Sequence, residues 1–144
     1  MIESDTIKLL RESDAGIKMG IASIDDVLDY VKDERFLKCL AECKNKHEEL
    51  KEEIQILLDQ YHDDGKDPDP MAKSMSWIKT NVKLVMDESD GTIADLMTDG
   101  CNMGVKSLNR YLNQYKAADE KSKDIAKRLI KLEEKLAVDI RCFL

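Results

Sequence analysis

The sequence has few aromatic residues, few helix breakers and no long apolar run. Aromatic residues make up 5% of the 144 residues, and there are only six glycines and two prolines. Charged residues, in contrast, make up 37%. This composition suits long helices and argues against a β-sandwich. We therefore expect an all-α protein, and the length predicts a single domain, residues 1–144, with an ordinary core.

The lack of basic and of long apolar segments argues against several partners. The net charge is −7 at pH 7, and the sequence shows no basic stripe that could release counterions from phosphates. No apolar run approaches the roughly 20 residues that a membrane span needs. The first five residues also lack the basic region and apolar core of a signal peptide. We expect a cytoplasmic protein with no nucleic-acid and no membrane partner.

The four cysteines form no recognised motif. They are Cys39, Cys43, Cys101 and Cys142, and no two of them make a C-x-x-C pair. A zinc ribbon and a thioredoxin-type redox site are therefore excluded. In a reducing compartment we expect these cysteines to be buried, reduced thiols.

The clearest helical pattern runs from Phe36 to Tyr61. Positions that alternate in steps of four and three along it are Phe36, Leu40, Cys43, His47, Leu50, Ile54, Leu57 and Tyr61. This spacing predicts a long bundle helix whose seam faces its neighbours. A cysteine and a histidine stand in the middle of the seam, where polar groups need partners or a metal.

Similar patterns predict three more long helices. One begins near Ser4, one covers about 92–115, and the last follows a break at 117–119. The inward residues of the last helix include Glu133, and those of the helix at 92–115 include Val105 and Leu112. Breaks at 32–34 and 61–70 separate the segments. We expect one hairpin over 4–62, a second over 90–144, and a crossover over 63–89 with a short helix at 71–86.

The two predicted hairpins repeat each other in sequence. When Gly16 is aligned with Gly100, Gly20 falls on Gly104, and a shift of two residues at the turn places His47 on Glu133. Each copy carries G-x-x-x-G inside a helix, at a cost of about 1 kcal/mol per glycine relative to alanine. We expect the first and third long helices to cross closely at these glycines. The alternative is that the glycines leave room for a ligand.

A duplicated hairpin with a helix-containing crossover resembles the ferritin-like superfamily. Residues 41–50 are similar to the second helix of rubrerythrin-type proteins, and residues 132–134 to the fourth. Residues 71–115 resemble a bacterial group of ferritin-like proteins with a short helix in the crossover. The resemblance implies a four-helix bundle made of two hairpins.

The resemblance also implies where a diiron centre would lie. Diiron members of the superfamily use one Glu from each of the first and third helices and a Glu-x-x-His from each of the other two. The ligand positions that this chain has lost are occupied by Ile17, Lys44, Cys101 and Leu136. Only His47 and Glu133 remain, and one His and one Glu cannot hold two metal ions. We therefore expect a degenerate diiron site without a cofactor.

Two functions follow from this sequence. The first is a non-enzymatic bundle that acts as a structural or protein-interaction module, with a homodimer expected by analogy. In it His47 and Glu133 form a hydrogen bond across the core. The alternative is a small metal-binding protein that holds a single zinc, copper or iron ion with His47, Glu133, Cys43 and Cys101.

Overall fold

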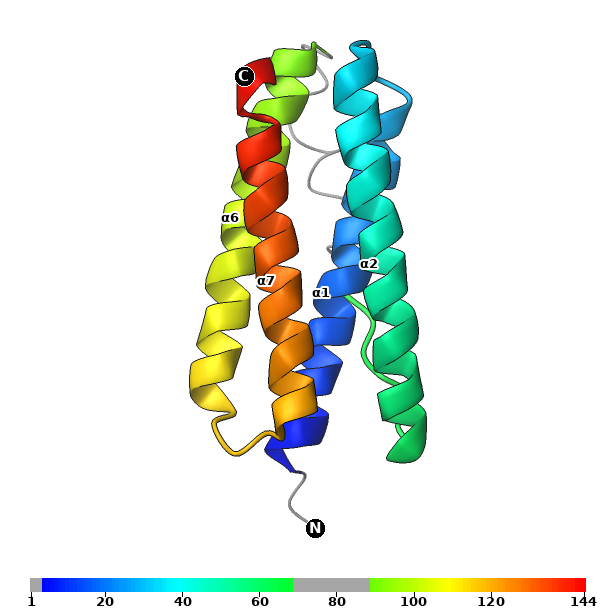
Figure 1. Ribbon diagram of the computed structural model, residues 1–144, viewed down its shortest axis with the longest axis vertical. Coiled ribbons are helices and arrows are strands. Elements are labelled where there is room, and N and C mark those ends of the chain that lie inside the picture. Colours follow the sequence, from blue (N-terminus) through cyan, green and yellow to red (C-terminus); the bar gives the residue numbers. More distant parts are fainter. Residues whose placement is uncertain (1–3, 69–88) are drawn as a thin grey trace.

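The computed structural model describes residues 4–68 and 89–144, which form a four-helix bundle (Figure 1). Its helices are α1 (Asp5–Leu28), α2 (Glu34–Gln60), α6 (Asp90–Gln114) and α7 (Glu120–Asp139), and a short 3-10 helix, η1 (Arg141–Phe143), ends the chain. No strand occurs in these two ranges, so the all-α prediction is confirmed there. The short helix predicted over 71–86 lies outside the described residues.

Each long helix begins after a polar side chain that caps it. Ser4, Asp33, Ser89 and Asp119 precede the four helices, and each side chain accepts a hydrogen bond from a backbone N–H in the first turn. Such caps satisfy donors that would have no partner within the helix. The helix boundaries therefore follow from short polar residues that the sequence places between its apolar patterns.

The order of the helices makes two antiparallel hairpins. In Figure 1, α1 runs upwards and α2 downwards, whereas α6 runs downwards and α7 upwards. The last residue of α2 and the first residue of α6 therefore lie at opposite ends of the bundle. Beyond the hairpin contacts, α7 packs against both α1 and α2, and α6 packs against α1. The two hairpins thus share one core.

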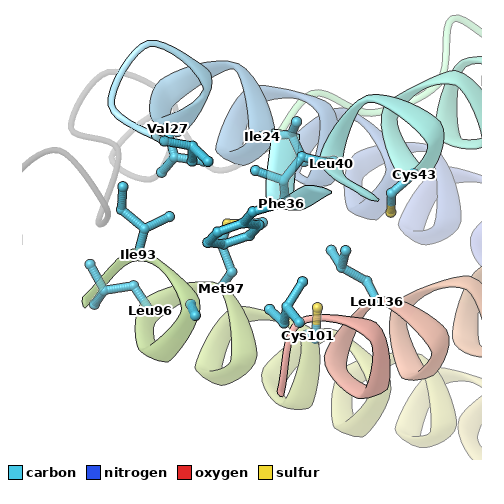
Figure 2. Close-up of a cluster of buried hydrophobic side chains, with 13 residues drawn as sticks. Ile24, Val27, Phe36, Leu40, Cys43, Ile93, Leu96, Met97, Cys101 and Leu136 are labelled. Atoms are coloured by element: carbon cyan, nitrogen blue, oxygen red, sulfur yellow. The ribbon is translucent and has the colours of Figure 1, made fainter. Parts of the chain in front are cut away.

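The apolar core is divided into two large clusters. The cluster at the end that holds the α1–α2 turn surrounds the fully buried Phe36 (Figure 2). The Phe36 ring stacks on Phe143, with 4.7 Å between the ring centroids, which joins η1 to the first hairpin. The other cluster contains Leu10, Ile17, Leu50, Ile54, Leu58, Leu108, Ile125, Leu129 and Ile130. Full burial of a side chain of this kind contributes about 1.5–3 kcal/mol.

The buried face of α2 drifts from the predicted seam near its C-terminal end. Leu58 is fully buried there, whereas Leu57 is half-buried and Tyr61 is 41% exposed. A straight helix has about 3.6 residues per turn and not the 3.5 of a heptad pattern, so the inward face moves by about 20° in every heptad. Two residues of α6 that were predicted to face inward, Val105 and Leu112, are likewise only half-buried.

Candidate functional site

His47 and Glu133 form a polar layer between the two core clusters. Cys43 and Leu50, on either side of His47 in α2, belong to different clusters, and Glu133 is flanked in the same way on α7. His47 is 2% exposed and Glu133 8% exposed. Two ionisable side chains therefore interrupt the apolar core near the middle of the bundle, as the sequence predicts.

Each of these side chains packs on a glycine of its own hairpin. A Cβ built on Gly20 of α1 would lie 2.6 Å from His47 Nε2, closer than real Cβ atoms approach other atoms. A Cβ built on Gly104 of α6 would overlap Glu133 Oε2. The internal repeat therefore places one glycine beneath one polar side chain in each hairpin.

The predicted close crossing of α1 and α6 at the glycines is wrong. The nearest atoms to a Cβ on Gly20 or Gly104 belong to the side chains from α2 and α7, not to the facing backbone. A Cβ on Gly16 would meet only Leu129 Cδ2, at 3.6 Å. The missing side chains make room for buried polar groups and for a cavity.

A cavity of about 620 Å³ lies between α1 and α6. These two helices form most of its wall, with His47 contributed by α2 and Glu133 and Leu136 by α7. The other described lining residues are Glu12, Ala15, Gly16, Met19, Gly20, Ser23, Ile24, residues 66–68, Met97, Gly100, Cys101, Met103, Gly104, Ser107, Leu108 and Tyr111. Its size falls within the range of about 300–1,000 Å³ that is typical of small-molecule pockets.

The His47 ring is neutral and offers a hydrogen-bond acceptor. Its Nδ1 lies 2.8 Å from the backbone carbonyl oxygen of Cys43. Because a carbonyl oxygen only accepts, Nδ1 must carry the hydrogen and donate it. Burial lowers the pKa of His47, which keeps the ring uncharged at neutral pH. Nε2 is then a bare acceptor, and it has no partner among the described residues.

The Glu133 carboxyl group is protonated at neutral pH. Burial raises its pKa from the ordinary value of 4.5 to about 8. Its Oε2 atom is buried and has no hydrogen-bond partner in the described part of the chain. A protonated carboxyl group can both donate and accept a hydrogen bond.

The predicted hydrogen bond between His47 and Glu133 is wrong. His47 Nδ1 donates its hydrogen bond to the carbonyl oxygen of Cys43. His47 Nε2 and Glu133 Oε2 both lack hydrogen-bond partners among the described residues. Each side chain lies over the glycine of its own hairpin, so the two line the same cavity without bonding to each other. The two polar atoms are therefore available to a third group.

The predicted metal ligands are neighbours, but they are not gathered into a cluster. Cys43 Sγ lies 3.5 Å from His47 Nδ1, the nitrogen that already carries a hydrogen. Burial raises the pKa of Cys43 and of Cys101 to about 12, and the nearby Glu133 carboxyl adds to both shifts. In the ranges 4–68 and 89–144, no group of three or more His, Cys, Asp or Glu residues is placed to hold a metal ion.

Lys44, which stands where the predicted resemblance would place a metal ligand, forms an ion pair away from the polar layer. Its Nζ lies 2.6 Å from Asp25 Oδ1, and the two side chains are 29% and 48% exposed. This ion pair between α2 and α1 raises the pKa of Lys44. The ammonium group is thereby kept at the surface of the first hairpin.

Asp14 supports a wall of the cavity, a role that the sequence did not reveal. It is fully buried, and its Oδ2 accepts a hydrogen bond from the Lys66 N–H at 3.1 Å and lies 2.8 Å from Lys18 Nζ. Gly65 has φ +80°, and a Cβ there would overlap Asp14 Oδ2. Asp14 therefore holds the start of the crossover against α1, where residues 66–68 line the cavity. The signal available in the sequence was that Asp14 interrupts the apolar series of the first helix.

Comparison of the chain with protein-family models, with curated proteins and with solved structures finds no match. None of the described helices is both long enough and apolar enough to cross a membrane. The resemblance to the ferritin-like superfamily thus stays a prediction from the residue pattern. What the site can do follows from its own geometry.

Proposed function

We propose that this bundle binds a small, largely apolar molecule in the cavity between α1 and α6. The observation that carries the proposal is the pair of buried, unpartnered atoms, His47 Nε2 and Glu133 Oε2, on the wall of one cavity. An unpaired buried polar group costs about 1–3 kcal/mol. A ligand that forms hydrogen bonds with these atoms would remove that cost.

The remaining lining supports the same class of ligand. Apolar side chains, among them Met19, Met97 and Leu108, cover much of the wall. Methionine is flexible and polarisable, so it adapts to ligands of irregular shape. The charged side chains that line the cavity include Glu12 and Lys66, which pair with each other at 2.6 Å. An apolar pocket with two polar groups at its floor is the usual form of a small-molecule site.

The ferritin-like assignment is part of this proposal. It is supported by two antiparallel hairpins, by the parallel directions of α2 and α6, and by the equivalent positions of His47 and Glu133 in the two hairpins. On this view the layer that holds metal in diiron relatives serves here as the polar floor of a cavity. Binding requires no catalysis, in line with the non-enzymatic module expected from the sequence. The homodimer and the cytoplasmic location stay predictions.

A single transition-metal ion is the second candidate ligand. It is favoured by one observation, the Nδ1 hydrogen bond of His47 to the Cys43 carbonyl, because metal-binding histidines commonly donate their second nitrogen in this way. Elemental analysis of protein purified without a His tag tests this candidate. Metal close to one ion per chain, lost in His47→Gln, would favour it over the organic ligand.

Binding of the neutral, apolar fluorophore N-phenyl-1-naphthylamine tests the leading proposal. We expect saturable binding at one site per chain. Ser107→Phe adds bulk to a residue that lines the cavity and should weaken binding at least tenfold, whereas Asn102→Phe, at an exposed position of the same helix, should leave it unchanged. Failure of the folded wild type to bind, or equal binding by the two variants, would overturn the proposal.

A further inference from the structure

The polar floor of the cavity restricts the chemistry of a ligand that would bind there. At His47 the restriction comes from geometry. The hydrogen on Nδ1 is held by the Cys43 carbonyl oxygen at 2.8 Å, so the free Nε2 can only accept a hydrogen bond. A ligand that reaches this atom must therefore bring a donor.

At Glu133 the restriction comes from the absence of a counter-charge. No cationic side chain in the described part of the chain pairs with this carboxyl group. Lys66, which also lines the cavity, pairs with Glu12 instead. The titratable groups whose pKa values respond to the Glu133 charge include Cys43 and Cys101, and both are buried thiols. A buried carboxyl group in such surroundings is most stable as the neutral acid, which presents a hydrogen-bond donor.

Charged ligand groups suit this floor poorly. A carboxylate would bring acceptors to the His47 Nε2 lone pair and find no cation to neutralise it. An ammonium group would require Glu133 to ionise inside the core, where the loss of hydration of both charges offsets much of their attraction. An uncharged group that both donates and accepts avoids both costs, because it can donate to Nε2 and accept from the carboxyl group.

On the basis of the proposed cavity function, we infer that the ligand carries an uncharged polar group with both donor and acceptor capacity, such as a primary amide or a hydroxyl, on an apolar body. His47 and Glu133 then select the polar group, while the walls of α1 and α6 accept the apolar body. The two residues are thus specificity determinants, and neither needs to take part in a reaction.

Calorimetric titration at pH 7 with four ligands of equal chain length tests this inference. The ligands are octanamide, octanoate, octylamine and octane. We expect octanamide to bind about tenfold or more tightly than the other three, which corresponds to one or two net hydrogen bonds. His47→Phe and Glu133→Leu should reduce octanamide affinity about tenfold and leave octane affinity within about threefold.

Two conservative variants keep the test informative if the apolar ones fail to fold. Glu133→Gln retains an uncharged group that donates and accepts, so octanamide affinity should stay within about threefold of the wild type. His47→Gln retains an acceptor and should behave in the same way. Glu134→Gln, at the exposed neighbouring position on α7, is the matched control and should change nothing.

The outcomes separate the inference from the function on which it rests. If octylamine bound most tightly and lost this affinity in Glu133→Gln, the ligand would carry a cation and the inference of an uncharged polar group would be wrong. The proposed cavity function would still stand. Equal affinity for octane and octanamide would overturn the inference in the same way. Failure of all four ligands and of N-phenyl-1-naphthylamine to bind the folded wild type would overturn both proposals.

Discussion

The imidazole ring of His47 lies over the bare backbone of Gly20, with Nε2 2.6 Å from the place that a Cβ would occupy. Glu133 and Gly104 repeat this relationship in the second hairpin. The glycines are therefore a spatial requirement of the polar side chains above them. Four predictions follow from this layer, from the thiols near it and from the contact of Gly65 with Asp14 at the start of the crossover.

Alanine at Gly20 should destabilise the bundle, and alanine at Gly104 should do so less. At Gly20 the added methyl group must displace the His47 ring, which its hydrogen bond to the Cys43 carbonyl holds in place, at a typical overpacking cost of about 1–3 kcal/mol. At Gly104 it meets the far end of the flexible Glu133 side chain, which can move at a smaller cost. Gly16→Ala is the control, because its methyl group would meet Leu129 at an ordinary 3.6 Å, and we expect a gain of up to about 1 kcal/mol from helix propensity. Urea unfolding measures all three variants. Equal stability of Gly20→Ala and Gly16→Ala would contradict this account of the glycines.

Glu133→Gln should become more stable relative to the wild type as the pH rises. The folded-state pKa of Glu133 is raised from 4.5 to about 8. The contribution of this group to the unfolding free energy is therefore most favourable below pH 4.5 and is lost as the pH rises to about 8. The glutamine does not titrate. The difference in unfolding free energy should therefore widen by up to about 5 kcal/mol in favour of the variant.

This difference is measured by urea unfolding of the wild type and of Glu133→Gln at several pH values between 4.5 and 8.5. The titration of His47 is common to both, so it cancels in the difference. Glu134→Gln, an exposed neighbour, should follow the wild type at every pH. Parallel stability curves for Glu133→Gln and the wild type would show that the Glu133 carboxyl group is not held neutral.

The thiols should react with Ellman's reagent in a defined order. Cys142 is exposed and should react first. Cys39 is half-buried, and burial raises its pKa, so it should follow more slowly. Cys43 and Cys101 are buried, with pKa values of about 12, and should react only when the bundle opens. The fast phase should disappear in Cys142→Ser, and rapid native labelling of Cys43 would contradict its place in the core.

Gly65→Ala should cost clearly more stability than Gly91→Ala. Gly65 adopts φ +80°, which costs other residues about 1–2 kcal/mol, and the added Cβ would also overlap the buried carboxyl group of Asp14. At Gly91, in the first turn of α6, the nearest atom to an added Cβ is 3.7 Å away. Thermal and urea unfolding compare the two. A similar loss in both would mean that Asp14 does not hold the crossover in this conformation.

The sequence was sufficient to place His47 and Glu133 in the core. Each stands at mid-helix in a series with helical spacing, which determines the side of the helix that faces inward. It could not determine which residue lies opposite, because a rotation of one helix, or an axial shift of about 1.5 Å per residue, changes the contact. For this reason the predicted His47–Glu133 hydrogen bond was wrong. His47 lies against Gly20 instead, and Glu133 lies against Gly104.

Asp14 shows a second reason why the site was only partly predictable. Its place in an apolar series marked it as unusual, but its backbone partner, Lys66, lies 52 residues further along the chain. Lys66 belongs to a segment without periodic pattern, so the sequence gives no signal for the helix face against which it lies. Contacts of this kind depend on the path of a loop, which local spacing does not encode.

The repeated hairpins also bear on how a guest molecule would be oriented. If the two hairpins presented identical polar residues, a bound polar group could face either hairpin in the same way, and its two orientations would be equivalent. Here one hairpin presents an imidazole acceptor and the other a carboxyl donor. Because the two hairpins differ at this position, an amide at the polar layer would have one favourable orientation, with its donor toward His47 and its acceptor toward Glu133.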